Sequence, residues 1–300
     1  MEEKFKGMIA AFVAAILWGL LIPTIRYLTL QGVSPILIAI VRLWTGSITL
    51  LILVLFIKNK INFTIENKKW FFIVALIGIS LNFILFQTGI KYTSANSAVL
   101  LGYTVPIWVL ILMLFFFREK INLLKVLAVV LSFTGVVLIV IGDSGLEALR
   151  GRSLIGDFLI IFSAITFAFF VIGSSEFLNM NKLNIIDRIE ILGKIFLTSA
   201  IVLSPLLFFV SYKINLLQFS IIAVLGIVQT TLAFSLWYYA LAKISTITSS
   251  LAFNLVIVTT FIFSWFLLKE SINAYMAIGG LLIIIAIFLS ENIKLIFKKH

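Results

Sequence analysis

Five polar side chains stand near the middle of long apolar runs, and they are the residues best placed to do chemistry. A polar group inside a membrane-spanning helix is costly unless it faces protein or water, so each is a candidate binding residue. Amides and hydroxyls can hydrogen-bond a small polar molecule without forming a covalent bond to it. The alternative for each is a hydrogen bond to a neighbouring helix, worth about 1–2 kcal/mol or less. The five are Asn82, Tyr103, Thr104, Gln229 and Asn254.

Aromatic residues in neighbouring apolar runs complete the candidate binding site. We expect Trp18, Phe167, Trp237 and Tyr238 to form the walls of a central cavity. A neutral cavity of this kind suits amino acids or other small zwitterions. Polyphosphates or sugar nucleotides would require several basic groups.

Two cations within apolar runs are possible contacts for an anion. Arg42 follows Pro35 by seven residues, which is about 10 Å along a helix. It either meets an anionic carboxylate or extends outward to the interface or to helix-end carbonyls. Lys194 follows Glu190 by four residues, so these two side chains are expected to neutralise one another.

The composition excludes a water-soluble globule. Of the 300 residues, 62% are hydrophobic and 12% are charged, whereas soluble domains carry about 25% charged residues. The chain has no cysteine and its one histidine is His300, so disulfides, thiol nucleophiles and multi-histidine metal sites are excluded. No metal or cofactor is expected. All acidic residues lie in loops or toward the ends of apolar runs, which favours facilitated diffusion or exchange over coupling to an ion gradient.

Ten apolar runs are long enough to cross a bilayer, whose core of about 30 Å requires roughly 20 residues of helix. We therefore predict an all-α integral membrane protein with ten transmembrane helices. The predicted helices are Met8–Leu28, Pro35–Ile57, Trp70–Ile90, Ala95–Phe117, Leu123–Gly142, Leu154–Ser174, Arg188–Ser211, Leu217–Tyr239, Thr246–Leu268 and Ala274–Leu295.

Basic residues set the expected orientation of these helices. If the N-terminus is inside, most of the 23 lysines and arginines fall in inner loops, among them Lys58, Lys60, Lys68 and Lys69. Cytoplasmic loops carry the excess of lysine and arginine. Both termini are therefore expected in the cytoplasm.

An internal repeat divides the chain into residues 1–145 and 146–300. Leu81–Asn122 aligns without gaps on Leu232–Asn273, at an offset of 151. Each half then holds five spans, an odd number, so the second half enters the membrane from the opposite face. Inverted repeats of this kind are common in transporters, which bind substrate near the midplane between the repeats. Equivalent positions include Ser94 and Ser245, Tyr103 and Asn254, Glu119 and Glu270, and Asn122 and Asn273.

Loose motifs in both halves carry a family resemblance. They are Ala15–Gly19, Arg42, Ala95–Pro106, Glu119 and Gly135 in the first half, and Gly156–Ala168, Thr248–Asn254, Glu270 and Gly279 in the second. Over essentially its whole length the chain resembles the drug/metabolite transporter superfamily, in particular its ten-helix group with two EamA domains. The resemblance implies export or exchange of amino acids and related metabolites across a prokaryotic plasma membrane. In one departure, the motif proline Pro106 has Ile257 as its repeat partner, so the two helices are not expected to be identical there.

The repeat, the polar residues and the resemblance together predict a secondary transporter. It would move small polar metabolites, such as amino acids or related zwitterions, by alternating access at a central cavity. Its expected partners are the lipid bilayer and the small-molecule substrate, without nucleic acid, and it would be a monomer or a weak homodimer. The alternatives are a channel, a membrane scaffold and an intramembrane enzyme, although the sequence lacks the H-E-x-x-H and G-x-S-x-G motifs.

Overall fold

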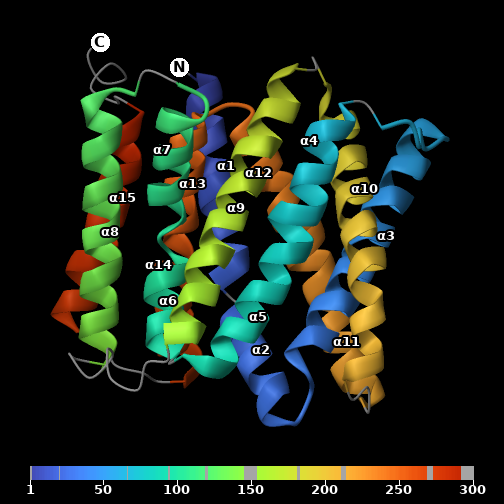
Figure 1. Cartoon of the computed structure of the whole chain (residues 1–300), viewed down its shortest axis with the longest axis horizontal. Coiled ribbons are helices and arrows are strands. Elements are labelled where there is room, and N and C mark those ends of the chain that lie inside the picture. The colour runs from blue at the N-terminus through green and yellow to red at the C-terminus, as the bar shows by residue number, and fades with distance from the viewer. Residues whose placement is uncertain are drawn as a thin grey trace.

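A bundle of long helices makes up the part of the chain that the computed structural model describes. That part comprises residues 2–19, 21–65, 67–93, 95–118, 121–144, 154–180, 183–210, 214–268 and 273–291, and it contains helices and no strands. Within it, eight helices are long and apolar enough to cross a membrane. The repeated Glu119 and Glu270 lie outside the described residues. The helices run side by side along one common direction (Figure 1). The predicted class, an all-helical membrane protein, is confirmed.

The first half of the chain runs from α1 to α8. Its elements are α1 (Glu2–Gly19), α2 (Leu21–Leu30), α3 (Pro35–Lys58), α4 (Lys68–Phe72), the π-helical segment η1 (Ile73–Leu81), α5 (Asn82–Tyr92), α6 (Ala95–Gly102), α7 (Val105–Phe115) and α8 (Leu123–Ser144).

The second half runs from α9 to α15. Its elements are α9 (Leu154–Met180), α10 (Ile185–Leu203), the 3-10 segment η3 (Ser204–Phe209), α11 (Leu216–Leu225), the π-helical segment η4 (Gly226–Ala233), α12 (Phe234–Leu241), α13 (Thr246–Phe253), α14 (Leu255–Leu268) and α15 (Ala274–Ser290).

Polar caps fix where several helices begin. Asn184 and Asn215 each accept a hydrogen bond from the backbone three residues ahead and complete a capping box. Ser245 and Asn273 accept the equivalent bonds at the start of α13 and α15. These caps satisfy backbone N–H groups that a helix leaves free. The cap residues Ser245 and Asn273 come directly before the starts of α13 and α15, which agree with the predicted starts.

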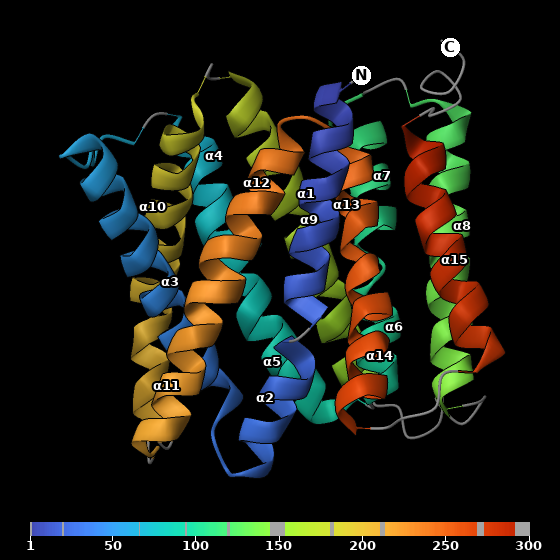
Figure 2. The same cartoon turned by 180° about the vertical axis from the view of Figure 1, so that it is seen from behind.

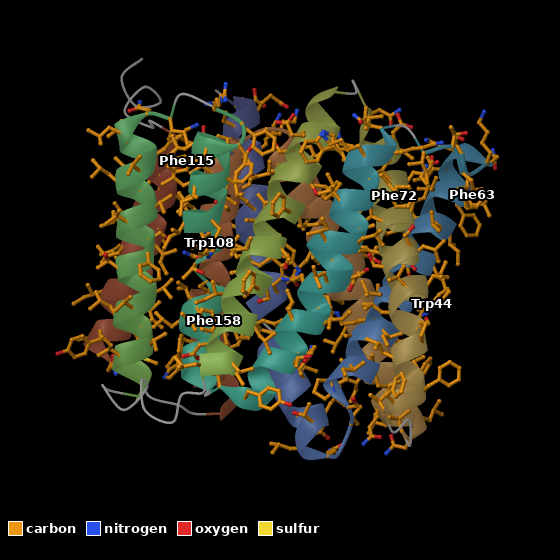
Figure 3. The ribbon with its side chains drawn as sticks, viewed as in Figure 1. Trp44, Phe63, Phe72, Trp108, Phe115 and Phe158 are labelled. Atoms are coloured by element: carbon orange, nitrogen blue, oxygen red, sulfur yellow. The ribbon has the colours of Figure 1, made fainter. Side chains whose placement is uncertain are left out.

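The outer faces of the bundle are apolar. Large hydrophobic side chains such as Phe56, Phe72, Phe115 and Phe158 are exposed, and the last three are labelled in Figure 3. So much exposed apolar surface is costly in water but is matched by lipid. Polar side chains such as Ser132, Ser163 and Thr230 are instead buried inside the bundle.

The two halves of the chain interleave. From the first half, η1 and α5 pack against α9, and α1 packs against η4, α12 and α14 of the second half. In addition, α3 packs on α10, and α8 packs on α15. The α8–α15 pair forms one edge of the bundle, and α3 and α10 lie at the opposite edge (Figures 1 and 2).

Both ends of the described chain lie at the same end of the bundle. Lys4 Nζ lies 2.8 Å from a carboxylate oxygen of Glu291, and Figure 2 shows the N-terminus and the end of α15 together. Glu291 also accepts hydrogen bonds from Thr248 Oγ1, at 2.7 Å, and from the backbone N–H of Ser245, at 2.9 Å. We call this end of the bundle the terminal end, and the opposite one the distal end.

Replacing Gly135 with alanine should destabilise the protein. A Cβ atom on Gly135 would lie 2.5 Å from the carbonyl oxygen of Gly279, and overpacking of this kind costs about 1–3 kcal/mol. Thermal unfolding of the detergent-solubilised protein measures the loss. Gly102→Ala is the control, because the nearest atom to its new Cβ, on Phe86, lies at an ordinary 3.6 Å. Equal melting temperatures for wild type and Gly135→Ala would contradict the close contact.

Acid should remove a stabilising contribution from Glu291. Burial raises the pKa of this carboxyl, but the bonds from Lys4, Thr248 and Ser245 outweigh burial and hold the pKa below its usual 4.5. Stability from a lowered folded-state pKa is present above the unfolded value and is lost as the pH falls through the folded one. The melting temperature of wild type should therefore fall between about pH 6 and about pH 3 by more than that of Glu291→Gln. Parallel pH dependences of the two proteins would rule this contribution out.

Candidate functional site

Two spans break near the centre of the bundle. Tyr103 and Thr104 separate α6 from α7, where Pro106 lies at the start of the second helix. Asn254 separates α13 from α14, and its N–H binds the carbonyl of Leu251 at 3.0 Å. A proline accounts for the first break because it lacks an N–H group. The second break has no proline, yet it occurs at the repeat position equivalent to Tyr103.

Two π-helical segments lie at similar places in the two halves of the chain. η1 leads directly into Asn82 at the start of α5, and η4 leads directly into Phe234 at the start of α12. A π-helical turn contains an extra residue and changes the direction in which the following side chains point. Both Asn82 and Phe234 line the cavity described next.

A cavity of about 270 Å³ lies between the two halves of the chain. It begins at Trp18, Phe167 and Phe253 and continues toward the distal end, where Pro35 and Gln87 belong to its lining. Most of its wall is aromatic or aliphatic. The polar residues of the lining are Arg42, Asn82, Gln87, Tyr103 and Ser163, and its aromatic residues other than Tyr103 are Trp18, Phe83, Phe86, Phe167, Phe234 and Phe253.

Arg42 is the charged residue in the lining of this cavity. Its side chain is buried, and Nε donates a hydrogen bond to Thr230 Oγ1 at 3.3 Å. Among the described residues, no carboxylate lies within ion-pair distance of the guanidinium. A buried charge is costly unless it is paired, so the cavity contains a cation that the described protein does not neutralise.

Hydrogen bonds between helices hold the polar wall in position. Asn82 Nδ2 donates to the carbonyl oxygen of Ser163 at 2.7 Å, which joins α5 to α9. Trp18 Nε1 donates to the carbonyl oxygen of Gln229 at 3.1 Å, which joins α1 to η4. The amide and the indole are therefore fixed by bonds to the backbone of the other half.

Five of the predicted site residues line this cavity. They are Trp18, Arg42, Asn82, Tyr103 and Phe167. The other six, Thr104, Lys194, Gln229, Trp237, Tyr238 and Asn254, lie outside its lining.

Several of the residues outside the lining have partners of their own. Thr104 accepts a hydrogen bond from Trp108 Nε1 at 3.2 Å. Gln229 Nε2 donates to the carbonyl oxygen of Leu17 at 3.3 Å. Lys194 is part of an ion-pair cluster at the terminal end of α10.

That cluster confirms the expected pairing of Lys194 with Glu190. Their charged atoms lie 3.3 Å apart, and Glu190 also pairs with Lys58 at 2.8 Å. Lys194 Nζ donates in addition to the carbonyl oxygens of Asn62, at 2.6 Å, and Thr64, at 3.3 Å. The cluster fastens the segment after α3 onto α10 and leaves Lys194 no contact with the central cavity.

Sequence reasoning missed several lining residues, notably Gln87 and Phe86. Gln87 is an amide inside an apolar run, like Asn82, but it stands nearer the end of its span and so did not satisfy the midplane criterion. The phenylalanines had no distinguishing signal in a chain that contains 29 of them.

Comparison with known proteins identifies the family. Residues 5–141 and 154–291 each match the model of the EamA-like transporter family. The chain belongs to the EamA-like transporter family. It is therefore a membrane transporter, with the bilayer and a small-molecule substrate as partners, and the predicted family is confirmed.

Similar proteins occur in archaea and bacteria. The chain is 30% identical to an "Uncharacterized transporter" of Archaeoglobus fulgidus over 223 residues, which is 73% of this chain and 74% of that protein. It is 24% identical to "Uncharacterized transporter YoaV" of Bacillus subtilis, over 95% of this chain and 96% of that one. A protein crystal structure with 16% sequence identity matches with a TM-score of 0.77 and covers 96% of this chain and 98% of its own, which shows a shared fold.

Replacing Lys194 with methionine should lower stability without changing the cavity. The substitution removes one cation from the buried Glu190 carboxylate and leaves two backbone carbonyls without their donor, at a cost of about 1–3 kcal/mol. Thermal unfolding in detergent measures the effect. Lys60→Met is the control, since Lys60 is exposed and outside the cluster. A Lys194→Met protein of normal stability would show that the cluster is not structural.

Proposed function

We propose that this transporter is a secondary carrier of small polar metabolites of the amino-acid or related zwitterion class, which works by alternating access at the central cavity. The observation that carries the proposal is the cavity itself. Both halves of the chain line it, Arg42 belongs to its lining without an ion-pair partner among the described residues, and hydrogen bonds between the halves fix Trp18 and Asn82. The substrate would contact Trp18, Asn82, Tyr103, Phe167 and Arg42.

The packing of the helices supports an inverted repeat of two five-span units, residues 1–145 and 146–300. In each half, the span that contains the π-helical segment packs on the first span of the other half: η1 and α5 on α9, and η4 and α12 on α1. The pairs α3–α10 and α8–α15 join equivalent spans. A two-fold axis between the halves accounts for all of these contacts. The shared position of Lys4 and Glu291 fits an even number of crossings, for which we propose ten.

The charges support an orientation with the terminal end in the cytoplasm. Lys58 ends α3, Lys68 and Lys69 begin α4, and Lys243 lies between α12 and α13, so all four lie at that end, as the positive-inside rule requires. In a prokaryotic plasma membrane, the cavity described above would then lie on the outer side of the midplane.

The lining supports a small substrate that carries a carboxylate. A cavity of about 270 Å³ is near the lower limit of ligand pockets, which typically measure about 300–1,000 Å³. Arg42 offers one cation for a carboxylate, and Asn82, Gln87 and Tyr103 offer hydrogen bonds. Among the described residues, the lining contains no acidic side chain, which fits facilitated diffusion or exchange better than proton coupling.

Counterflow in proteoliposomes tests this function. Unlabelled leucine inside the vesicles should drive saturable uptake of labelled leucine, or of another standard amino acid from a panel. Arg42→Gln should raise the half-saturating concentration by about tenfold or more, because a hydrogen bond to a charged group contributes about 1.5–3 kcal/mol. Arg42→Lys retains the charge, so its half-saturating concentration should lie between those of wild type and Arg42→Gln.

The amide of the same amino acid provides the matched control. Leucinamide lacks the carboxylate and competes more weakly than leucine for the wild-type protein, and Arg42→Gln should not weaken its competition further. This comparison separates loss of a carboxylate contact from misfolding, which would weaken both ligands. Uptake that does not saturate would favour a channel, and absence of counterflow with every amino acid would remove the proposed substrate class.

A further inference from the structure

Three buried polar atoms in the second half have no hydrogen-bond partner among the described residues. They are Gln229 Oε1, Ser249 Oγ and Asn254 Oδ1. Leaving a buried polar atom unpaired costs about 1–3 kcal/mol, and few native groups do so without a reason. Two of them, Ser249 and Asn254, precede and follow Phe253 along the chain, and Phe253 lines the cavity.

The repeat relates these residues to the cavity that is already formed. At the offset of 151, Asn254 corresponds to Tyr103 and Ser249 corresponds to Ala98. At the same offset Trp237 corresponds to Phe86, and Tyr238 corresponds to Gln87. All four first-half residues line the described cavity, whereas all four second-half residues are buried outside it.

Trp237, Tyr238 and Ser249 lie on the terminal side of the cavity, and Asn254 directly follows Phe253 at the centre of the bundle. α12 runs from Phe234, which lines the cavity, toward the terminal end, and α13 begins at that end (Figures 1 and 2). The first set, from the first half, extends from the same centre toward the distal end. The two sets are therefore placed as an inverted repeat would place them, one on each side of the centre.

Specific contacts hold residues of the second set against α9. The Trp237 ring stacks on Phe170 with centroids 5.4 Å apart and planes 17° apart. The hydroxyls of Tyr238 and Ser174 lie 2.9 Å apart, which links α12 to α9. A second hydrogen bond of this kind joins α9 to α13, where the hydroxyl oxygens of Ser175 and Thr246 lie 2.8 Å apart.

From this correspondence we infer a second binding cavity, lined by Trp237, Tyr238, Ser249 and Asn254, that opens toward the terminal end when the described cavity closes. The inference rests on the proposed carrier function. The unpaired Ser249 and Asn254 oxygens are the groups that receive the polar substrate in that state, in the places taken by Ala98 and Tyr103 in the present one. The Tyr238–Ser174 hydrogen bond is the latch that has to break first.

The second cavity differs from the first in charge. At the offset of 151, Arg42 corresponds to Gly193 of α10, which has no side chain. The neighbouring Lys194 is held by Glu190 and by two backbone carbonyls. The second cavity therefore offers neutral donors and acceptors without a cation of its own. Its ligand is the same small polar solute, held there by amide, hydroxyl and aromatic groups.

Single cysteines test this assignment directly, because the natural chain has none. Gln87→Cys reports on the described cavity and Ser249→Cys on the inferred one. Ser47→Cys is the buried control, since Ser47 and Ser249 are both fully buried. Each variant is exposed to a membrane-impermeant maleimide in sealed vesicles of either orientation.

Gln87→Cys should react only from the distal side, Ser249→Cys only from the terminal side, and Ser47→Cys from neither. If Ser249→Cys is as unreactive as Ser47→Cys while Gln87→Cys reacts, the second cavity is overturned and the carrier function stands. If Gln87→Cys itself fails to react from the distal side, the proposed carrier cavity is overturned as well.

Removing the latch supplies the second measurement. Tyr238→Phe should raise the labelling rate of Ser249→Cys about threefold and lower that of Gln87→Cys, since a side-chain hydrogen bond within a membrane protein shifts an equilibrium by about that factor. Opposite changes at the two positions indicate a shift between two access states. Equal increases at both positions would indicate general loosening and would overturn the latch.

Discussion

Polar groups in this protein have to find their partners inside the bundle, because the hydrocarbon of a bilayer offers none. Side chains meet this constraint by binding backbone carbonyls of neighbouring helices. Trp18 binds the carbonyl of Gln229, Asn82 that of Ser163, and Thr259 that of Ala15, at 2.9 Å. Each of these bonds joins one half of the chain to the other, and each contributes only about 0.6 kcal/mol on average. The halves are thus held in register around the cavity by weak, replaceable contacts.

The sequence predicted the helical membrane class, the family and many helix starts, because these depend on local patterns. Pro35, Leu123 and Ala274 follow turn and cap residues that end one helix and begin the next. The breaks inside spans and the π-helical segments were not predicted. The break at Asn254, for example, has no nearby proline that would indicate it. Depth in the membrane also does not determine which face of a helix a residue occupies. Tyr103 lines the cavity and its neighbour Thr104 does not, and that difference depends on packing alone.

Departures from the repeat are where the chemistry differs between the halves. Arg42 lines the cavity, whereas its equivalent at the offset of 151, Gly193 of α10, packs closely on Leu50 and Leu51. Pro106 and Ile257 differ as well, yet both spans break at the same relative position. Shared shape therefore tolerates unlike residues, as long as the helices can still approach one another. The polar groups that face the centre differ more than the backbone that carries them.

Gly135 and Gly279 bring the backbones of α8 and α15 into direct contact at one edge of the bundle. Each glycine lies beneath the carbonyl oxygen of the other, so neither helix can roll without driving a branched neighbour such as Val136 or Ile283 into the gap. If one half rotates on the other about this contact, the displacement of the helices is smallest at the contact and increases with distance from it. The largest excursions then fall at the far edge, where α3 meets α10 (Figures 1 and 2). The ion pairs of Lys58 and Lys194 with Glu190 lie at that far edge, where the displacement would be largest.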